Sequence, residues 1–74
     1  MLSSRFIKGA ILKDKYNDDI YLVTHKWIPV KMFGDTYISV LCIKGDYKGE
    51  ARSYPESRGK KIGMSLDEAM VELL

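Results

Sequence analysis

Short apolar runs bounded by turn residues, a pattern typical of strands, occupy most of the chain, and a helical period appears only near the C-terminal end. The most apolar run lies at 37–43, within an expected strand at 37–44, and has apolar residues on both faces, so we expect it to be a central strand. Its two faces would be formed by Ile38, Val40 and Cys42, and by Tyr37, Ser39, Leu41 and Ile43. One face would pack on a helix, and the other would meet a partner subunit or a ligand.

Three further strands are expected before this run, at 5–13, at 20–27 and, as a short strand or an extended continuation, at 30–33. Gly9 interrupts the first of them and predicts a bulge or bend. The polar segment 14–19 predicts a turn, because its Asn and Asp residues tolerate left-handed backbone. Pro29 would end the second strand, since it cannot donate to a ladder, and Gly34-Asp35 predicts another turn.

The segment after the central strand predicts a second hairpin and a loop. Gly45-Asp46 is expected to turn the chain, and 47–54 to form a more exposed strand with two aromatic and two basic side chains. The segment 55–61 contains Pro, Ser, Gly and four charged residues, a composition typical of a solvated loop.

The segment 65–74 predicts a helix with a capping box. Ser65 and Glu68 match the Ser-x-x-Glu pattern, in which the serine hydroxyl accepts from the third amide and the glutamate reaches back to the cap amide. The apolar stripe would be formed by Leu66, Ala69, Met70 and Leu73. Because so short a helix is not stable alone, this stripe has to pack on the sheet. We therefore expect one α+β domain over residues 1–74: a four- to five-stranded antiparallel sheet with one C-terminal helix packed on one face.

Size and composition narrow the class of protein. The chain has 74 residues and one Cys, so we expect no internal disulfide and burial of only about 60% of the unfolded surface. Small domains without a disulfide often bury additional apolar surface by associating with another chain, which favours a homodimer. No segment reaches the roughly 20 apolar residues of a membrane span. The start does not resemble a secretory signal, and the lone Cys42 suits a reducing compartment, so we expect a cytoplasmic protein without a membrane partner.

No residue pattern predicts catalysis, a metal site or a cofactor. His25 is the sole histidine and lies in a strand pattern, where such a side chain is usually satisfied by a neighbour. Cys42 lies between two apolar residues, a setting that raises the pKa of a thiol and makes it inert. Gly45 and Gly49 lack the downstream Lys-Ser/Thr of a phosphate loop. We therefore expect a protein that is not an enzyme.

Basic residues interleaved with aromatic residues are the feature that indicates a function. The net charge is only +2, but segment 44–61 carries six basic residues, whereas the final helix carries three acids and no base. Cations meet phosphates, and aromatic rings stack on the bases of single strands. The candidate nucleic-acid-binding residues are Lys44, Lys48, Arg52, Arg58, Lys60, Lys61, Tyr47, Tyr54 and Trp27. In the alternative interpretation, the two strand tyrosines pack across strands and the basic residues only solubilise a loop.

The segment from Tyr37 onward resembles the positive cofactor four family, the single-stranded-DNA-binding transcriptional coactivators. The similar residues are Ile38-Ser39-Val40 in a strand, then Gly49-Glu50, Pro55, and the run from Gly59 to Leu66 that opens the helix. The resemblance implies a curved four-stranded antiparallel sheet, a C-terminal helix, a dimer and a groove for single-stranded DNA, with Lys60 and Lys61 as phosphate contacts. Leu41-Cys42-Ile43 stands where the family usually has an arginine and aromatic residues.

The same order of three strands and a helix also resembles the arm-binding domain of tyrosine recombinases and the second half of a double-stranded-RNA-binding domain. We therefore expect a non-catalytic nucleic-acid-binding protein, with single-stranded DNA as its first candidate ligand and an accessory role in transcription or replication. The alternative is a small interaction protein of the phage or plasmid type. Such a protein would inhibit or regulate a host protein that it binds through an apolar sheet face or an exposed edge strand.

Overall fold

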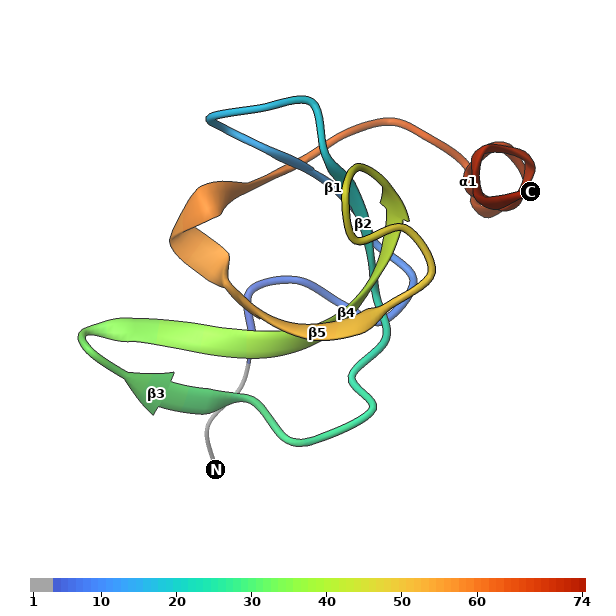
Figure 1. The fold of residues 1–74 in the computed structure, drawn as a ribbon. Coiled ribbons are helices and arrows are strands. Elements are labelled where there is room, and N and C mark those ends of the chain that lie inside the picture. Colours follow the sequence, from blue (N-terminus) through green and yellow to red (C-terminus); the bar gives the residue numbers. More distant parts are fainter. Residues whose placement is uncertain (1–3) are drawn as a thin grey trace.

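The computed structural model describes residues 4–74 and confirms an α+β fold with an antiparallel sheet and a C-terminal helix (Figure 1). Within the described residues the sheet has six strands, more than the four or five expected. The strands are β1 (Ile11–Asp14), β2 (Ile20–Val23), β3 (Val30–Met32), β4 (Asp35–Lys44), β5 (Ala51–Pro55) and β6 (Gly59–Lys61). A 3₁₀ turn, η1 (Glu56–Arg58), separates β5 from β6, and the helix is α1 (Leu66–Leu73).

Strand β4 is the central strand, as its apolar pattern predicts. Val40 pairs with Val23 of β2 on one edge and with Arg52 of β5 on the other. The strand order is β3-β4-β2-β1-β6, with β5 on the second edge of β4. Because β4 is long, its first residues pair with β3 while its last residues pair with β2, so one strand joins the projecting hairpin to the body of the sheet (Figure 1).

The two ends of the sheet are brought together by η1. The chain leaves β5 on the edge of β4, makes the 3₁₀ turn, and pairs as β6 with β1, where Lys60 lies opposite Lys13. The Lys15 amide also donates to the Arg58 carbonyl at 2.8 Å. The sheet therefore curls into a partly closed barrel. The expectation of a plain loop at 55–61 is wrong, because a Gly-Lys-Lys strand shows no apolar alternation and forms only against its distant partner.

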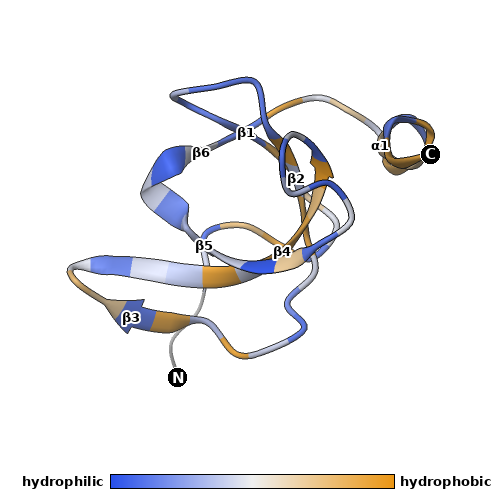
Figure 2. Cartoon of the chain, viewed as in Figure 1, coloured by the Kyte–Doolittle hydropathy of each residue, from blue (hydrophilic) through white to orange (hydrophobic). Residues whose placement is uncertain are grey.

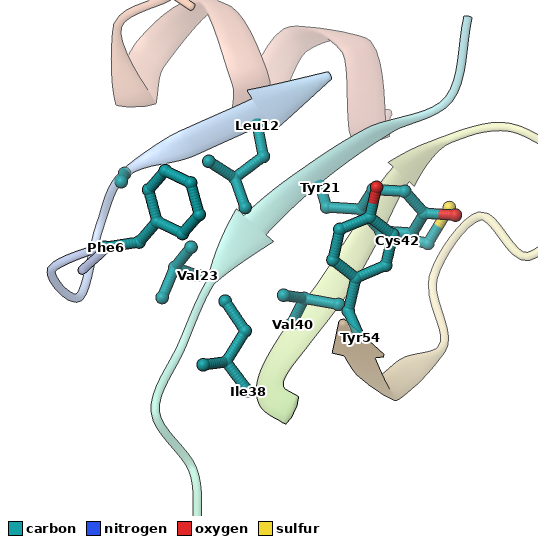
Figure 3. Packing of buried hydrophobic residues seen from close by; sticks show 9 residues of the cluster. Phe6, Leu12, Tyr21, Val23, Ile38, Val40, Cys42 and Tyr54 are labelled. Carbon is teal, nitrogen blue, oxygen red and sulfur yellow. The ribbon is translucent and has the colours of Figure 1, made fainter. Parts of the chain in front are cut away.

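The inside of the curled sheet holds the larger core. Its members come from the segment before β1 and from β1, β2, β4 and β5: Phe6, Ala10, Leu12, Tyr21, Val23, Ile38, Val40, Cys42 and Tyr54 (Figure 3). Ile38, Val40 and Cys42 are fully buried there. The expectation that one face of β4 meets a partner or a ligand is therefore wrong. The chain covers that face with its own strands, since curling buries more apolar surface than an open sheet would.

Helix α1 covers the opposite face of the sheet. Ala69 and Ile43 are fully buried between them, together with Ile11 and Ile20, and Leu73 packs against this second core. The helix and one half of its capping box are confirmed: the Glu68 amide donates to Ser65 Oγ at 3.2 Å, but the Glu68 carboxylate accepts from the Ser65 hydroxyl at 3.2 Å and not from the cap amide as predicted. The predicted stripe holds only in part, because Leu66 is 51% and Met70 37% exposed. No helix in residues 4–74 has the length and apolar character that a membrane span requires.

Two predicted strands are shorter than expected, because residues with positive φ lie just before the first of them and just after the second. Gly9 (φ +94°) lies in a turn closed by the Ala10 amide and the Ile7 carbonyl at 3.1 Å, so the first strand begins only at Ile11. His25 (φ +47°) turns the chain away just after β2. The predicted 14–19 turn connects β1 and β2 as expected, except that Asp14 is still the last residue of β1.

The predicted strand 47–54 also loses its first half. Residues 46–49 form a turn in which the Lys48 amide donates to the Gly45 carbonyl at 3.2 Å, and the Glu50 amide donates to the Tyr47 carbonyl at 2.9 Å. Strand β5 therefore starts at Ala51. The longer turn lifts Tyr47 out of the sheet and places it over the end of β5.

Strands β3 and β4 form a hairpin that projects from the barrel (Figure 1). Its turn is Phe33-Gly34, one residue earlier than predicted, and both residues have positive φ, +52° and +78°. Such angles match the tight two-residue turns that suit the twist of a hairpin. Along β3 the apolar Val30 and Met32 flank the polar Lys31, which Figure 2 shows as an orange, blue and orange pattern.

Candidate functional site

A cleft of about 340 Å³ opens at one end of the barrel. Three separate parts of the chain line it: the turn between β1 and β2, the turn between β4 and β5, and β5 with η1. We call it the tyrosine cleft. Its tyrosines are Tyr21, Tyr47 and Tyr54, and its charged side chains are Asp14, Asp19, Arg52 and Arg58.

Two of the tyrosines form the floor of the cleft. The ring centroids of Tyr21 and Tyr54 are 4.5 Å apart with an interplanar angle of 37°, and both residues are buried (Figure 3). Alternation along β2 and β5 points both rings into the barrel. Gly59 makes room for the Tyr54 ring, because a Cβ there would lie 3.1 Å from Tyr54 Cε2 and 3.0 Å from Leu12 Cδ1.

Asp14 anchors this floor from the end of β1. Its carboxylate accepts hydrogen bonds from the Tyr54 hydroxyl at 2.8 Å and from the Tyr16 amide at 2.8 Å, and Arg58 Nη2 lies 3.3 Å from Oδ2. Burial alone would raise the pKa of Asp14, but these hydrogen bonds and the Arg58 charge outweigh it and hold the pKa below its ordinary value. The carboxylate therefore stays ionised and pins three segments of chain together.

The buried phenols are held in their neutral form. Burial, and then the charge of Asp19, raises the pKa of Tyr21 to about 12. Burial and the hydrogen bond to Asp14 raise the pKa of Tyr54 as well. At neutral pH both hydroxyls are therefore donors within the fold rather than acid–base groups.

Each arginine of the cleft lies over an exposed tyrosine at the rim. Arg52 Cζ is 3.7 Å from the ring centroid of Tyr47, and Arg58 Cζ is 5.3 Å from that of Tyr16. The rings are accessible, with Tyr47 43% and Tyr16 77% exposed. Both guanidinium groups and the Tyr47 ring line the cleft, whereas Tyr16 is not part of its lining and is placed next to it by its cation–π pair with Arg58. The distance from Arg52 Nη1 to Glu50 Oε1 is 4.0 Å. Because both side chains are exposed, this ion pair is weak.

A second hollow of about 260 Å³ lies beside the tyrosine cleft and shares Asp14 with it. Its other lining residues are Lys13, Lys15 and Lys60. Lys13 and Lys60 are brought together by the β1–β6 register, and Lys13 is paired with Asp18 at 3.3 Å. The basic rim of the cleft thus continues across β1 onto β6.

The structure brings together four of the nine predicted binding residues: Arg52, Arg58, Tyr47 and Tyr54. Tyr54 is only 6% exposed and has no open ring face, so the stacking role expected for it is wrong. Its ring packs as the alternative interpretation of the strand tyrosines described. Tyr47 remains accessible.

The other predicted residues lie elsewhere. Lys60 lines the second hollow, and Lys61 lies opposite Leu12 on the edge strand β6. Lys44 ends β4, and Lys48 is exposed in the turn that carries Tyr47. Trp27 lies between β2 and β3, where its amide donates to Ser39 Oγ at 3.3 Å, and it lines neither hollow.

Sequence reasoning missed the contribution of the 14–21 region. The pattern favours a turn there over a carboxylate site at Asp18 and Asp19, yet Asp14 and Asp19 line the cleft, Lys15 lines the second hollow and Tyr16 pairs with Arg58. The one available signal was Tyr16, an aromatic residue next to Lys15 inside an otherwise polar turn.

The remaining chemically versatile side chains belong to the framework. The ring Nε2 of His25 lies 2.8 Å from the Phe6 carbonyl, so it donates there, and Nδ1 is buried without a partner in the described chain. Cys42 is fully buried, and burial raises the pKa of its thiol. Residues 4–74 contain no cluster of three or more His, Cys, Asp or Glu side chains that could hold a metal ion.

Comparison of the chain with protein-family models, with curated proteins and with solved structures gives no match in any of the three. The resemblance to the positive cofactor four family therefore stays a prediction. The cleft has to be interpreted from its own residues and geometry.

Proposed function

We propose that the protein binds single-stranded nucleic acid, with DNA as the first candidate, at the rim of the tyrosine cleft. The observation that carries the proposal is that Arg52 and Arg58 both line one cleft and each is paired with an exposed tyrosine ring, Arg52 with Tyr47 of the lining and Arg58 with the adjacent Tyr16. Single-strand binders combine cations for the backbone with rings on which bases stack. Here the guanidinium groups would meet the phosphates, and the tyrosine rings would stack on the bases.

The basic residues beyond the cleft would continue the path of the backbone. Lys15 and Lys60 line the hollow next to Asp14, on the side of the cleft where Arg58 lies. A strand with a base on Tyr47 and a phosphate at Arg52 would reach these lysines with its following phosphates. The proposed binding residues are therefore Tyr47, Arg52, Arg58 and Lys60 from the predicted set. Tyr16 and Lys15 are added to them.

The proposed role is non-catalytic. Tyr54 and Asp14 are hydrogen-bonded to one another, the partly buried His25 is bonded to the Phe6 carbonyl, and Cys42 is fully buried. The protein would act as an accessory in transcription or replication, in the cytoplasm, where an unpaired Cys42 persists.

The test is fluorescence anisotropy with labelled single-stranded oligonucleotides. We expect affinity to fall as salt rises from about 50 mM to about 200 mM, with a slope near −2 on a log–log plot for about three phosphate contacts. Arg52→Ala should reduce that slope, and Tyr47→Ala should weaken binding about tenfold, within the range of one lost base stack.

Matched controls lie on the β3–β4 hairpin. Lys31→Ala removes an exposed basic residue and Phe33→Ala an exposed ring, both away from the cleft. Neither should change the affinity. A failure to bind any oligonucleotide at low salt, or an equal loss in the hairpin and cleft variants, rejects the proposal.

A second candidate function is binding of a host protein through the hairpin. Phe33 is 95% exposed at φ +52°, a conformation in which a bulky side chain is strained. Val30 and Met32 are also exposed next to it. A strained, solvated phenylalanine at a hairpin tip is a reasonable anchor for an apolar pocket on a partner.

The two candidates separate in one pull-down from nuclease-treated host lysate. Protein binding predicts a stoichiometric, salt-tolerant complex that Phe33→Ala abolishes and Tyr47→Ala leaves intact. Loss of every retained molecule after nuclease treatment contradicts it and favours the first candidate.

The proposed homodimer rests on the small size of the chain and on apolar side chains left open on α1. Leu66 is 51% and Val71 70% exposed on that helix. Light scattering after gel filtration would give the molar mass directly. A mass of one chain at high micromolar concentration would reject the dimer.

A further inference from the structure

Asp19 is the charged side chain of the tyrosine cleft that forms no ion pair within residues 4–74. Asp14 is paired with Arg58, and Arg52 lies near Glu50. The Asp19 carboxylate accepts only one side-chain hydrogen bond in this part of the chain, from the Tyr21 hydroxyl at 3.3 Å, which is long for an O–H donor. Most of its accepting capacity therefore remains free in the cleft.

The neighbouring turn leaves room for this carboxylate. Gly45 has φ +129°, and a Cβ at this position would overlap the carboxylate oxygens of Asp19. The Asp19 amide is bonded to Asn17 Oδ1 at 2.8 Å, which fixes the backbone from which the side chain projects. The carboxylate is thus held against a glycine by two turns that are far apart in sequence.

A free carboxylate is unfavourable beside phosphates, so a nucleic-acid site that contains one needs a donor to face it. Carboxylates only accept hydrogen bonds. Guanine is the base that presents two adjacent donors on one edge, N1–H and the N2 amino group, which match the two oxygens of a carboxylate. Thymine and uracil present a single N–H between two carbonyl oxygens, and these would be repelled.

We propose that the tyrosine cleft selects guanine, with Asp19 accepting from its N1–H and N2 amino groups. This rests on the proposed function. Tyr47, at the rim, would stack on the base, and Arg52 would meet the adjoining phosphate. Bases in single strands are commonly recognised on this edge, because it is not occupied by pairing.

The experiment compares three labelled oligonucleotides of equal length by anisotropy. One is all thymine, one has a single central guanine, and one has hypoxanthine in place of that guanine, which keeps N1–H and lacks the 2-amino group. We expect the guanine strand to bind about tenfold more tightly than the thymine strand, the scale of one bidentate base contact. The hypoxanthine strand should lie between them.

Asp19→Asn is the test variant and Asp18→Asn the matched control, since Asp18 is exposed in the same turn and paired with Lys13. Asp19→Asn should remove the preference for guanine over hypoxanthine while leaving affinity for the thymine strand equal or higher. Asp18→Asn should keep the preference. Circular dichroism on each variant shows that the fold is retained.

The possible failures are distinguishable. Equal binding of the three strands by the unmodified protein overturns guanine selection and leaves the proposed function in place. A guanine preference that survives in Asp19→Asn overturns the role of Asp19. Absence of binding to all three strands overturns the proposed function, and the inference with it.

Discussion

The Tyr54 hydroxyl donates to the Asp14 carboxylate at 2.8 Å, across 40 residues of chain. This bond joins β5, which pairs with β4, to the end of β1, which pairs with β2 and β6, so it connects two strands that form no ladder with one another. Arg58 closes the same junction from η1, with Nη2 3.3 Å from Asp14 Oδ2. The closure of the barrel and the floor of the tyrosine cleft therefore depend on one carboxylate.

Removal of the Tyr54 hydroxyl should destabilise the fold. Tyr54→Phe keeps the ring that packs on Tyr21 and loses a buried hydrogen bond to a charged group, which contributes about 1.5–3 kcal/mol. Urea unfolding followed by circular dichroism measures the free energy of unfolding. Tyr16→Phe is the control, because that tyrosine is 77% exposed, and its stability should match the unmodified protein. Equal stability of both variants would contradict the assigned bond.

Acid should weaken the same junction. The pKa of Asp14 is held below its ordinary value, so the unfolded chain takes up the proton more readily than the folded one. The stabilisation is complete above about pH 4, the ordinary range of an aspartate, and is lost as pH falls through the folded pKa. Urea midpoints between pH 5 and pH 2 should fall for the unmodified protein and less for Asp14→Asn. A parallel fall in both would assign the acid sensitivity to other groups.

Alkali should destabilise the protein through the buried phenols. The pKa of Tyr21 is raised to about 12 by burial and by Asp19, so the unfolded chain, with an ordinary tyrosine pKa near 10, loses the proton first. The stabilisation present below about pH 10 is lost as pH rises through the folded value. Melting temperatures measured from pH 8 to pH 12 should decline above pH 10, and Tyr21→Phe should flatten this decline. A variant with an unchanged decline would refute the assignment.

Gly59 should not tolerate a side chain. Its absent Cβ would lie 3.0 Å from Leu12 Cδ1 and 3.1 Å from Tyr54 Cε2, so Gly59→Ala should destabilise the fold by about 1–3 kcal/mol, the usual cost of overpacking. Gly63 has open space around it and no positive φ, so Gly63→Ala should leave stability unchanged or raise it slightly. Chemical denaturation distinguishes the two variants. A neutral Gly59→Ala would show that β6 can move away from Tyr54.

Local signals account for the elements that the sequence predicts correctly. The capping pair Ser65 and Glu68 starts α1, and the two-faced apolar run becomes β4. No local signal predicts strand β6 or the full length of the turn at 45–50. Gly59-Lys60-Lys61 has no strand pattern of its own, and it becomes a strand because η1 delivers it to β1.

The candidate site divides in the same way. Arg52, Arg58 and Tyr47 could be predicted, because basic and aromatic residues recur in one stretch of chain. Asp14 and Asp19 could not, since they join the site from the end of β1 and from the turn that follows it. Tyr54 was predicted as a stacking ring, yet alternation along β5 and the curl of the sheet place it in the core.

By itself, the sequence determined the central strand, the capped helix, the 14–19 turn and a basic, aromatic stretch after residue 44. These follow from periodicity and turn chemistry, which act between neighbours in the chain. Only the tertiary structure decided which face of β4 is buried under which residues, which tyrosines are accessible, and which carboxylates meet the arginines. Those outcomes depend on the curling of the sheet, because burial of apolar surface on both faces brings together residues that no local pattern connects.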